Sequence, residues 1–280
     1  MKLEDLKTLL RENKLYTKKR LDQHFLYTDA ILEREVEYAG VTELDDVLEI
    51  GPGIGTLTEK IVEKAKSVTV IELDQQFRQI LEQKLSINII IGDALKVDWK
   101  KMSNEYVAPV FTKILSNVPY SISSPLIFKI LDYGPEAAVL CLQKEFAQRM
   151  VAEPGTKDYS RLSVNCAVRA DVELLEEISR ELYFPVPKVD SAIVRLIPKR
   201  GGAGARGHRG ADTKLPEKFD DIVRAAFQHK NQKLKKALMH SWKELGTKEE
   251  AQTFVGKLGE IGERKVFEIS PGEFVKISKI

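Results

Sequence analysis

Cysteine and histidine are scarce in this sequence of 280 residues, which contains two cysteines and four histidines. Cys141 and Cys166 cannot build a disulfide framework, and they form no C-x-x-C pair. The sequence has no H-E-x-x-H motif and no Cys/His cluster, so we expect no metal site. We interpret both cysteines as buried thiols in a reducing compartment, and we expect the protein to be cytoplasmic.

Long apolar runs are missing as well. A membrane-spanning helix needs about 20 apolar residues, whereas the run at 137–142, among the longest here, has six. The N-terminus starts with charged residues and lacks the apolar core of a signal peptide. Hydrophobic residues make up 43% and charged residues 31% of the chain. These proportions are typical of a folded globular protein and exclude collagen-like and wholly disordered classes.

The net charge of +2 is unevenly distributed. Residues 200–280 carry 17 basic and 11 acidic side chains, a net charge of +6. Residues 1–199 carry 27 and 31, a net charge of −4. A basic C-terminal part favours a polyanionic partner bound there, although ordinary solvated helices have the same composition.

Predicted strands and helices alternate from about residue 47 onward. Short apolar, β-branched stretches predict strands at 47–50, 68–71, 87–91, 113–115, 137–142, 172–178 and 191–197. Apolar residues at helical spacing predict helices at 56–64, 75–85, 161–169, 219–242 and 248–258. This alternation predicts an α/β fold with a mostly parallel sheet covered on both faces. We expect three parts: a main domain at 1–199, a flexible Gly/Arg-rich linker at 200–213 and a small helical domain at 214–280.

The strongest local signal is E-I-G-P-G-I-G at 49–55, where a strand meets a helix. Gly51, Gly53 and Gly55 permit a tight turn and the close approach of a ligand to backbone N–H groups. Thr56 stands where a dinucleotide fingerprint has its third glycine, and no P-loop lysine follows. The spacing therefore favours an adenosyl ligand smaller than NAD, with a purely structural turn as the alternative.

Acidic residues follow at the ends of the next two strands. Glu72 can accept hydrogen bonds from ribose hydroxyls, and Asp74 is a competing candidate whose other role is to cap the next helix. In G-D-A at 92–94, the Asp93 carboxylate can hold the exocyclic amine of adenine, although Gly-Asp also forms ordinary turns. Three such features at successive strand ends together favour a nucleoside pocket.

The sequence S-N-V-P-Y at 116–120 follows the fourth strand. The Asn117 amide oxygen and the Val118 carbonyl can accept the two N–H bonds of an aromatic amine, which turns the nitrogen lone pair toward an electrophile. Tyr120 offers a flat face for a splayed-out base, and Pro119 stiffens the turn. A structural turn with a core tyrosine is the alternative.

Phe184 begins the proline-rich stretch at 184–191. A rigid loop there can hold Phe184 against the other face of the base, and a core phenylalanine is an alternative of equal weight. Cys141 and Cys166 lack a preceding proline and an adjacent general base, which disfavours a covalent cysteine mechanism.

Basic side chains cluster near both ends of the chain. We expect phosphate contacts, which position RNA without reading its sequence, from eight residues: Lys18, Lys19, Arg20, Arg224, Lys230, Lys233, Lys235 and Lys236. The alternative is the solvated face of a helix.

The ordered motifs resemble those of the ribosomal-RNA adenine dimethyltransferases, which modify two adjacent adenosines near the 3′ end of small-subunit rRNA. The resemblance covers residues 18–236 and rests on seven motifs in order: K-K-R-L-D-Q-H-F-L (18–26), E-I-G-P-G-I-G (49–55), I-E-L-D (71–74), G-D-A (92–94), N-V-P-Y (117–120), F-P-V-P-K-V-D-S (184–191) and F-Q-H-K-N-Q-K-L-K-K (227–236). The stretch at 155–164 is similar to the archaeal branch.

The resemblance implies a Rossmann-like methyltransferase sheet that uses S-adenosylmethionine, without a metal, to methylate adenine N6 twice by direct in-line transfer. It implies a monomer that acts on a pre-ribosomal small subunit during ribosome biogenesis. The implied donor site contains His24, Leu26, Gly51, Gly53, Gly55, Glu72, Asp93, Ala94 and Asn117. The implied grip on the target adenine comes from Asn117, Tyr120 and Phe184, and Pro119, which stiffens the turn, completes the predicted catalytic residues.

Three features depart from the family pattern. Asp22 stands where the family usually has glycine, and it can alter the loop or weaken the approach of acidic phosphates. His24 stands where the family often has asparagine, which is tolerable if the backbone makes the contact. The Gly/Arg-rich segment at 200–211 is not expected of the family.

Three other functions stay open. A large-subunit rRNA adenine methyltransferase would share the pocket motifs, but the stretches at 155–164 and 227–236 favour the small subunit. A non-catalytic assembly or transcription factor on the same fold would not need to keep Asn117, Pro119 and Tyr120. A small-molecule methyltransferase would need no basic C-terminal part.

Overall fold

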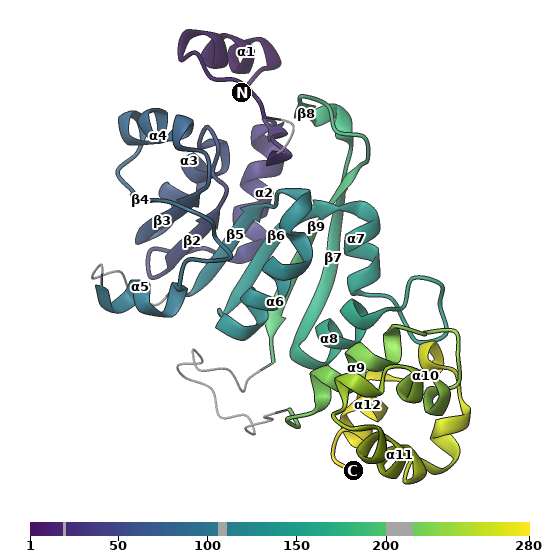
Figure 1. Cartoon of the computed structure of the whole chain (residues 1–280). Helices are drawn as coiled ribbons and strands as arrows, with labels where there is room; N and C mark the ends of the chain where they lie inside the picture. Colours follow the sequence, from purple (N-terminus) through teal and green to yellow (C-terminus); the bar gives the residue numbers. More distant parts are fainter. Residues whose placement is uncertain (19–20, 106–110, 200–214) are drawn as a thin grey trace. The chain divides into compact units, whose positions relative to one another are not determined.

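The computed structural model describes residues 1–18, 21–105, 111–199 and 215–280 (Figure 1). It forms two compact units. The first comprises Met1–Ala147 and Glu173–Pro198, and the second comprises Gln148–Val172, Lys199 and residues 215–280. The sequence predicts residues 148–172 as part of the first domain, but they pack with the C-terminal helices. The predicted linker at 200–213 lies outside the described residues.

A seven-stranded sheet forms the centre of the first unit (Figure 1). Its strands, in spatial order, are β4 (Asn88–Ile91), β3 (Ser67–Glu72), β2 (Asp46–Ile50), β5 (Lys113–Asn117), β6 (Ala137–Gln143), β9 (Ser191–Pro198) and β7 (Ala170–Ile178). The first five are parallel, and β9 runs antiparallel to β6. The predicted α/β class and mostly parallel sheet are therefore confirmed.

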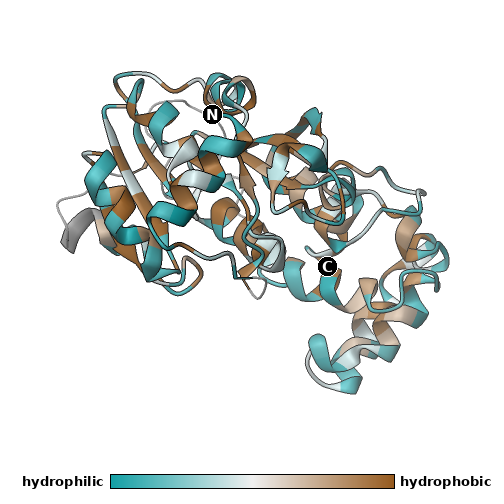
Figure 2. Cartoon of the chain, turned by 90° about the horizontal axis from the view of Figure 1, so that it is seen from above, coloured by the Kyte–Doolittle hydropathy of each residue, from teal (hydrophilic) through white to brown (hydrophobic). Residues whose placement is uncertain are grey.

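Helices cover both faces of this sheet, which explains why all of β2 is buried and why β6 is a nearly continuous apolar run. The helices of this part of the chain are α1 (Leu3–Glu12), α2 (Asp29–Ala39), α3 (Thr56–Val62), α4 (Arg78–Lys84), α5 (Trp99–Glu105), α6 (Ser123–Tyr133) and α7 (Lys144–Met150). In Figure 1, α6 lies in front of β6 and α2 lies behind it. Val139 and Cys141 of β6 join the apolar cluster of α2. In Figure 2, brown stretches run along the strands of the sheet.

The predicted helix at 75–85 begins as a 3-10 turn, Gln75–Phe77, and continues as α4. The side chain of Asp74 accepts the Gln76 N–H at 3.2 Å, so Asp74 is the cap that the sequence suggested. The pairing of β1 (Phe25–Leu26) with β8 (Tyr183–Phe184) was not predicted.

The second unit is helical and has its own apolar core. Its helices are α8 (Arg161–Arg169), α9 (Phe219–Phe227), α10 (Leu234–His240), α11 (Lys248–Gly256) and α12 (Pro271–Ile277), with 3-10 turns at Trp242–Glu244, Gly259–Glu263 and Val266–Glu268. Buried side chains of Tyr159, Phe219, Leu234 and Phe274 form the centre of the core.

The predicted single helix at 219–242 is wrong. It is interrupted between α9 and α10 because the backbone there pairs with another segment instead of with itself. The Leu234 N–H donates to the Arg264 carbonyl at 2.9 Å, and the Val266 N–H donates to the Gln232 carbonyl at 3.0 Å. These bonds lie on either side of Lys233, the residue before α10, whose ψ of 142° is not helical.

Both cysteines are buried, and burial raises the pKa of the Cys166 thiol to about 12. Among the described residues, no helix is long and apolar enough to cross a membrane.

Candidate active site

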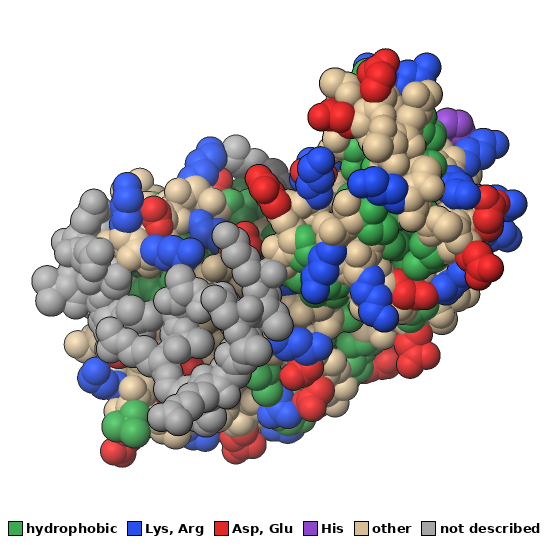
Figure 3. All heavy atoms as spheres, turned by 90° about the horizontal axis from the view of Figure 1, so that it is seen from below, with side chains coloured by type: hydrophobic (Ala, Val, Ile, Leu, Met, Phe, Trp, Pro, Cys, Tyr) green, Lys and Arg blue, Asp and Glu red, His purple; other side chains and the backbone are tan. Residues whose placement is uncertain are grey.

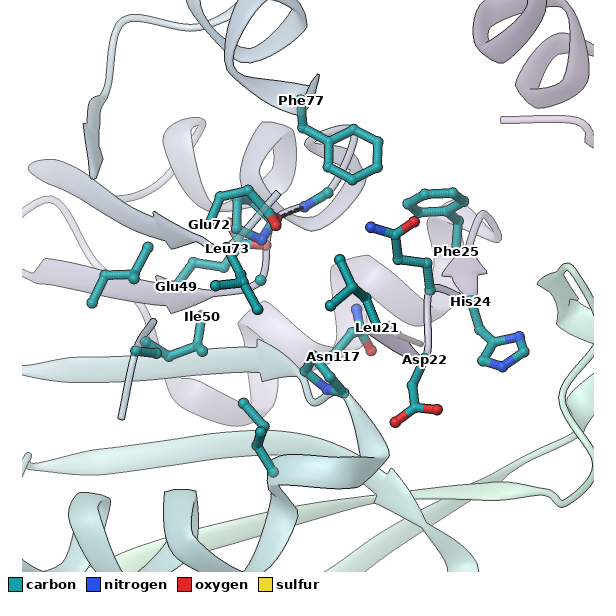
Figure 4. Close-up of a pocket in the computed structure, with 18 of the residues that line it drawn as sticks. Leu21, Asp22, His24, Phe25, Glu49, Ile50, Glu72, Leu73, Phe77 and Asn117 are labelled. Atoms are coloured by element: carbon teal, nitrogen blue, oxygen red, sulfur yellow. Dashed lines mark hydrogen bonds between the residues drawn. The ribbon is translucent and has the colours of Figure 1, made fainter. Parts of the chain in front are cut away.

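The carboxyl ends of β2, β3, β4 and β5 meet at a cavity of about 120 Å³ (Figure 4). This is the edge of a parallel sheet where ligands bind in doubly wound folds. The N-terminal segment closes the cavity through residues 21–26. Nearly all predicted donor-site residues line it: His24, Leu26, Gly51, Gly53, Glu72, Asp93, Ala94 and Asn117.

Gly53 leaves no room for a side chain at the cavity wall. Gly53 has φ +55°, and a Cβ placed on it would lie 2.8 Å from Cε1 of Phe25. Gly55 is different, because it does not line the cavity. A Cβ there would lie 3.1 Å from Leu81 of α4, so this glycine allows helix packing instead.

Glu72 is buried at the end of β3, and each of its carboxylate oxygens accepts one backbone N–H. Oε2 accepts from Gly53 at 3.0 Å and Oε1 accepts from Asp74 at 2.8 Å. Burial nevertheless raises the pKa of Glu72. Asp74 does not line the cavity, because Lys18 and Gln23 hold it at 2.8 and 2.9 Å. The geometry therefore selects Glu72 over Asp74 as the acidic residue that faces a ligand.

Glu49 is a cavity residue that we did not predict as part of the site. It is buried at the start of the glycine motif, and its Oε2 has no hydrogen-bond partner among the described residues. Burial raises the pKa of Glu49 to about 8. The signal was present, since an acidic residue opens the glycine motif in the sequence.

The loop after β4 is held in place from α6. Asp93 closes its own turn, because Oδ1 accepts the Leu95 N–H at 2.9 Å. Lys129 donates to the carbonyls of Ala94, Leu95 and Val97 at 2.8, 3.0 and 2.5 Å. Nothing in the sequence marked Lys129, since it belongs to no motif.

Asn117 ends β5 with its side-chain oxygen buried and without a partner among the described residues. A buried amide oxygen without a hydrogen bond costs about 1–3 kcal/mol, so this oxygen, at the wall of the cavity, is free to accept from a donor group of a ligand.

A second, small cavity of about 20 Å³ adjoins Asn117, and Tyr120 lines it. The Tyr120 hydroxyl lies 2.9 Å from Ser191 Oγ, and its ring stacks on His24 with centroids 6.0 Å apart. Burial raises the pKa of this hydroxyl. The small cavity shares Asp22, His24 and Asn117 with the large one, so these three residues stand where the two cavities meet.

Phe184 lines neither cavity. Its ring packs against the apolar core of the first unit, and Lys7 Nζ lies 5.9 Å from the ring centre. This environment matches the alternative that the sequence left open, a phenylalanine that packs with the core. It arises because β8 pairs Phe184 opposite Phe25. A contact between Phe184 and a target base stays a prediction.

Most of the basic residues predicted to bind RNA already have intramolecular partners. Lys233 and Lys235 pair with Glu263 at 2.9 and 3.1 Å, and Arg224 pairs with Glu244 at 3.1 Å. Lys18 is paired with Asp74, Lys230 donates to the Lys157 carbonyl at 2.7 Å, and Lys19 and Arg20 lie outside the described residues. Lys236 is exposed. On the face shown in Figure 3, basic and acidic side chains are interspersed.

Comparison with known proteins relates this chain to ribosomal RNA methyltransferases. The sequence profile of the family described as ribosomal RNA adenine dimethylase matches residues 14–280. A protein of Methanothermobacter thermautotrophicus, named probable ribosomal RNA small subunit methyltransferase A, is 40% identical over 98% of this chain and 94% of its own length.

Two solved structures share the fold across most of their length. A dimethyladenosine transferase from Plasmodium falciparum superimposes with a TM-score of 0.72 at 29% identity, covering 90% of this chain and 95% of that one. The 23S rRNA methyltransferase ErmE superimposes with a TM-score of 0.62 at 27% identity, covering 91% and 98%.

Proposed function

We propose, since this chain belongs to the ribosomal RNA adenine dimethylase family, that it methylates N6 of two adjacent adenosines near the 3′ end of small-subunit rRNA. The family uses S-adenosylmethionine as methyl donor. The observation that carries the proposal is the buried, unpaired oxygen of Asn117 at the meeting point of the two cavities.

The residues of the large cavity fit the donor. Each Glu72 oxygen keeps a lone pair for a ribose hydroxyl after accepting one backbone N–H. Asp93 uses Oδ1 for its turn, and Oδ2 is left with Lys96 at 3.7 Å, so it can accept from the exocyclic amine of adenine. The donor, when bound, supplies an electrophilic methyl group on its sulfonium.

The small cavity supplies the acceptor side. The Asn117 oxygen accepts one N–H of the target amine, which directs the nitrogen lone pair toward the donor. Tyr120, held by Ser191 and His24, presents a ring for the target base to stack on. The chain then contributes mainly orientation, and no strong general base is required.

The small-subunit substrate is favoured over the large-subunit one. The Methanothermobacter relative, 40% identical, carries a small-subunit name, whereas the 23S rRNA enzyme is 27% identical. We include in the proposal that the substrate is a pre-ribosomal small subunit, that the enzyme acts as a monomer in the cytoplasm, and that it needs no metal.

The test supplies labelled S-adenosylmethionine and small subunits from cells that lack the modification, and maps the label to individual nucleotides. We expect dimethyladenine at two adjacent 3′-end adenosines. Asn117→Ala should lower the rate at least 100-fold while donor binding is weakened but measurable.

Other outcomes of this experiment contradict the proposal. Label in the large subunit would assign the protein to the alternative enzyme class. Tight subunit binding without any transfer would favour a non-catalytic assembly factor. Wild-type rates in Asn117→Ala would remove the role given to Asn117.

RNA contact is tested separately on the second unit. Lys236→Glu reverses an exposed charge of the predicted phosphate surface, so RNA affinity should fall three- to tenfold and the salt dependence should become shallower by about one ion. Lys279→Glu, at an exposed site near the C-terminus, is the matched control. Equal losses in both variants would show only a general effect of net charge.

A further inference from the structure

Three described residues line both cavities, and the function proposed above uses only two of them. Asn117 is the acceptor of the target amine, and His24 supports the Tyr120 ring. In Figure 4 the third residue, Asp22, lies between Asn117 and His24. It has no role in the mechanism so far.

The backbone of Asp22 is in the left-handed region, with φ +50°. Among the described residues other than glycine, only Lys14 shares this property, with φ +53°. Asp and Asn tolerate this conformation better than other side chains do, at a cost of about 1 kcal/mol. The cost of this backbone conformation points to a contact that offsets it.

That contact is a hydrogen bond across 99 positions of sequence. The Ser121 N–H donates to Asp22 Oδ2 at 3.0 Å. Ser121 belongs to the 3-10 turn Tyr120–Ile122, which directly follows Asn117 and Pro119. The bond therefore joins the segment that closes the donor cavity to the loop that carries the acceptor residues.

Neighbouring contacts fasten the same two segments to the proline-rich loop. His24 Nδ1 lies 2.6 Å from the Pro185 carbonyl oxygen, and Tyr120 reaches Ser191. Of these contacts, the one from Asp22 is the direct hydrogen bond between the N-terminal segment and the turn at Ser121.

We infer that Asp22 is a positioning residue, which sets the alignment of donor and target amine by fastening the N-terminal segment to the Ser121 turn. The inference rests on the proposed methyl transfer. In-line transfer is sensitive to displacements of about 1 Å, so loss of this tie should lower kcat more than it weakens donor binding. The donor contacts at Gly51, Glu72 and Asp93 stay in place.

The test compares four variants in the methyl-transfer assay. Asp22→Ala and Asp22→Gly both remove the hydrogen-bond acceptor, and each should lower kcat about tenfold with less than a threefold change in the KM for the donor. Asp22→Asn keeps an acceptor oxygen at the same place and should restore most of that rate. Lys14→Ala, at the other left-handed site, should leave the rate unchanged.

The backbone alternative makes a different prediction. If only the left-handed conformation matters, Asp22→Gly, which adopts it freely, would equal the wild type. That result would overturn the inference, and so would a full loss in Asp22→Asn, because it would show that charge and not the hydrogen bond matters.

Amide hydrogen exchange makes the test independent of catalysis. The Ser121 amide should exchange at least tenfold faster in Asp22→Ala and Asp22→Gly than in the wild type or Asp22→Asn. Unchanged protection of the Ser121 amide would show that the hydrogen bond to Asp22 does not hold the turn, even if the wild type proved inactive on rRNA. Inactive wild type with the expected exchange pattern would instead refute the proposed function alone.

Discussion

At Gly53 the backbone conformation and the wall of the cavity impose the same requirement. A φ of +55° is strained for any residue with a Cβ, and that Cβ would lie 2.8 Å from the Phe25 ring. Phe25 is buried and also packs edge-on against Phe77, so it cannot move away cheaply. Glycine is thus required here for two independent reasons.

Gly53→Ala should therefore lower the free energy of unfolding by about 2–3 kcal/mol, measured by urea denaturation, because strain and overpacking add. Donor affinity, measured by calorimetry, should fall at least tenfold, because Phe25 lines the cavity. Gly256→Ala is the control. It sits in α11 with open space around it and should be neutral or stabilise by about 0.5–1 kcal/mol. Equal effects of the two substitutions would contradict this account.

At the scale of elements, α6 supports the donor site through Lys129. Its ammonium group donates to three backbone carbonyls in the turn that follows Asp93. It also lies 4.6 Å from the centre of the Trp99 ring. The turn itself lacks regular secondary structure to satisfy these carbonyls. The helix therefore stabilises a loop that would otherwise have to find its hydrogen bonds in water.

Lys129→Met should lower the free energy of unfolding by about 2 kcal/mol, because three carbonyls lose a charged donor. It should also raise the Kd for the donor several-fold, since Asp93 and Ala94 lose their support. Lys101→Met on α5, where the side chain is exposed, should change stability by less than about 0.5 kcal/mol. Unaltered donor affinity in Lys129→Met would show that the loop keeps its shape without this helix.

For the molecule as a whole, buried carboxyl groups make folding depend on pH. Glu35 of α2 is fully buried, and neither of its oxygens has a partner among the described residues. Burial, together with the charges of Glu49 and Glu176, raises the pKa of Glu35 well above its usual range. The pKa of Glu49 is raised to about 8.

Proton linkage determines whether the free energy of unfolding rises or falls with pH. Between about pH 4.5 and the raised pKa values, the folded state holds protons that the unfolded state has released, so stability falls as pH rises, by up to about 1.4 kcal/mol per pH unit for each such group. Glu35→Gln removes one of these protons. Its unfolding free energy should decline less steeply from pH 5 to pH 8 than that of the wild type.

Urea denaturation at pH 5, 6, 7 and 8 measures this slope. Glu37→Gln, on the exposed side of the same helix, should keep the wild-type slope. A slope in Glu35→Gln as steep as in the wild type would mean that Glu35 does not carry the linkage.

Neighbouring residues in the sequence are enough to predict part of the site. The glycine turn, Glu72 and Asp93 at successive strand ends, and Asn117 after the fourth strand can all be identified from the sequence. Strand ends of a parallel sheet meet at one edge, so local spacing was enough to place these residues together. Short apolar, β-branched stretches likewise predicted most strands to within two residues of their observed bounds.

The contacts between distant segments depend on how the whole chain folds. They pack Phe184 against the core, join Asp22 to Ser121, bring Lys129 to the loop after Asp93 and interrupt the predicted helix at Lys233. Each depends on partners between 30 and 159 positions away, for example the 99 positions between Asp22 and Ser121. Hydrophobic periodicity reports only how a segment meets its own neighbours, so it carries no information on which remote backbone will satisfy a given polar group.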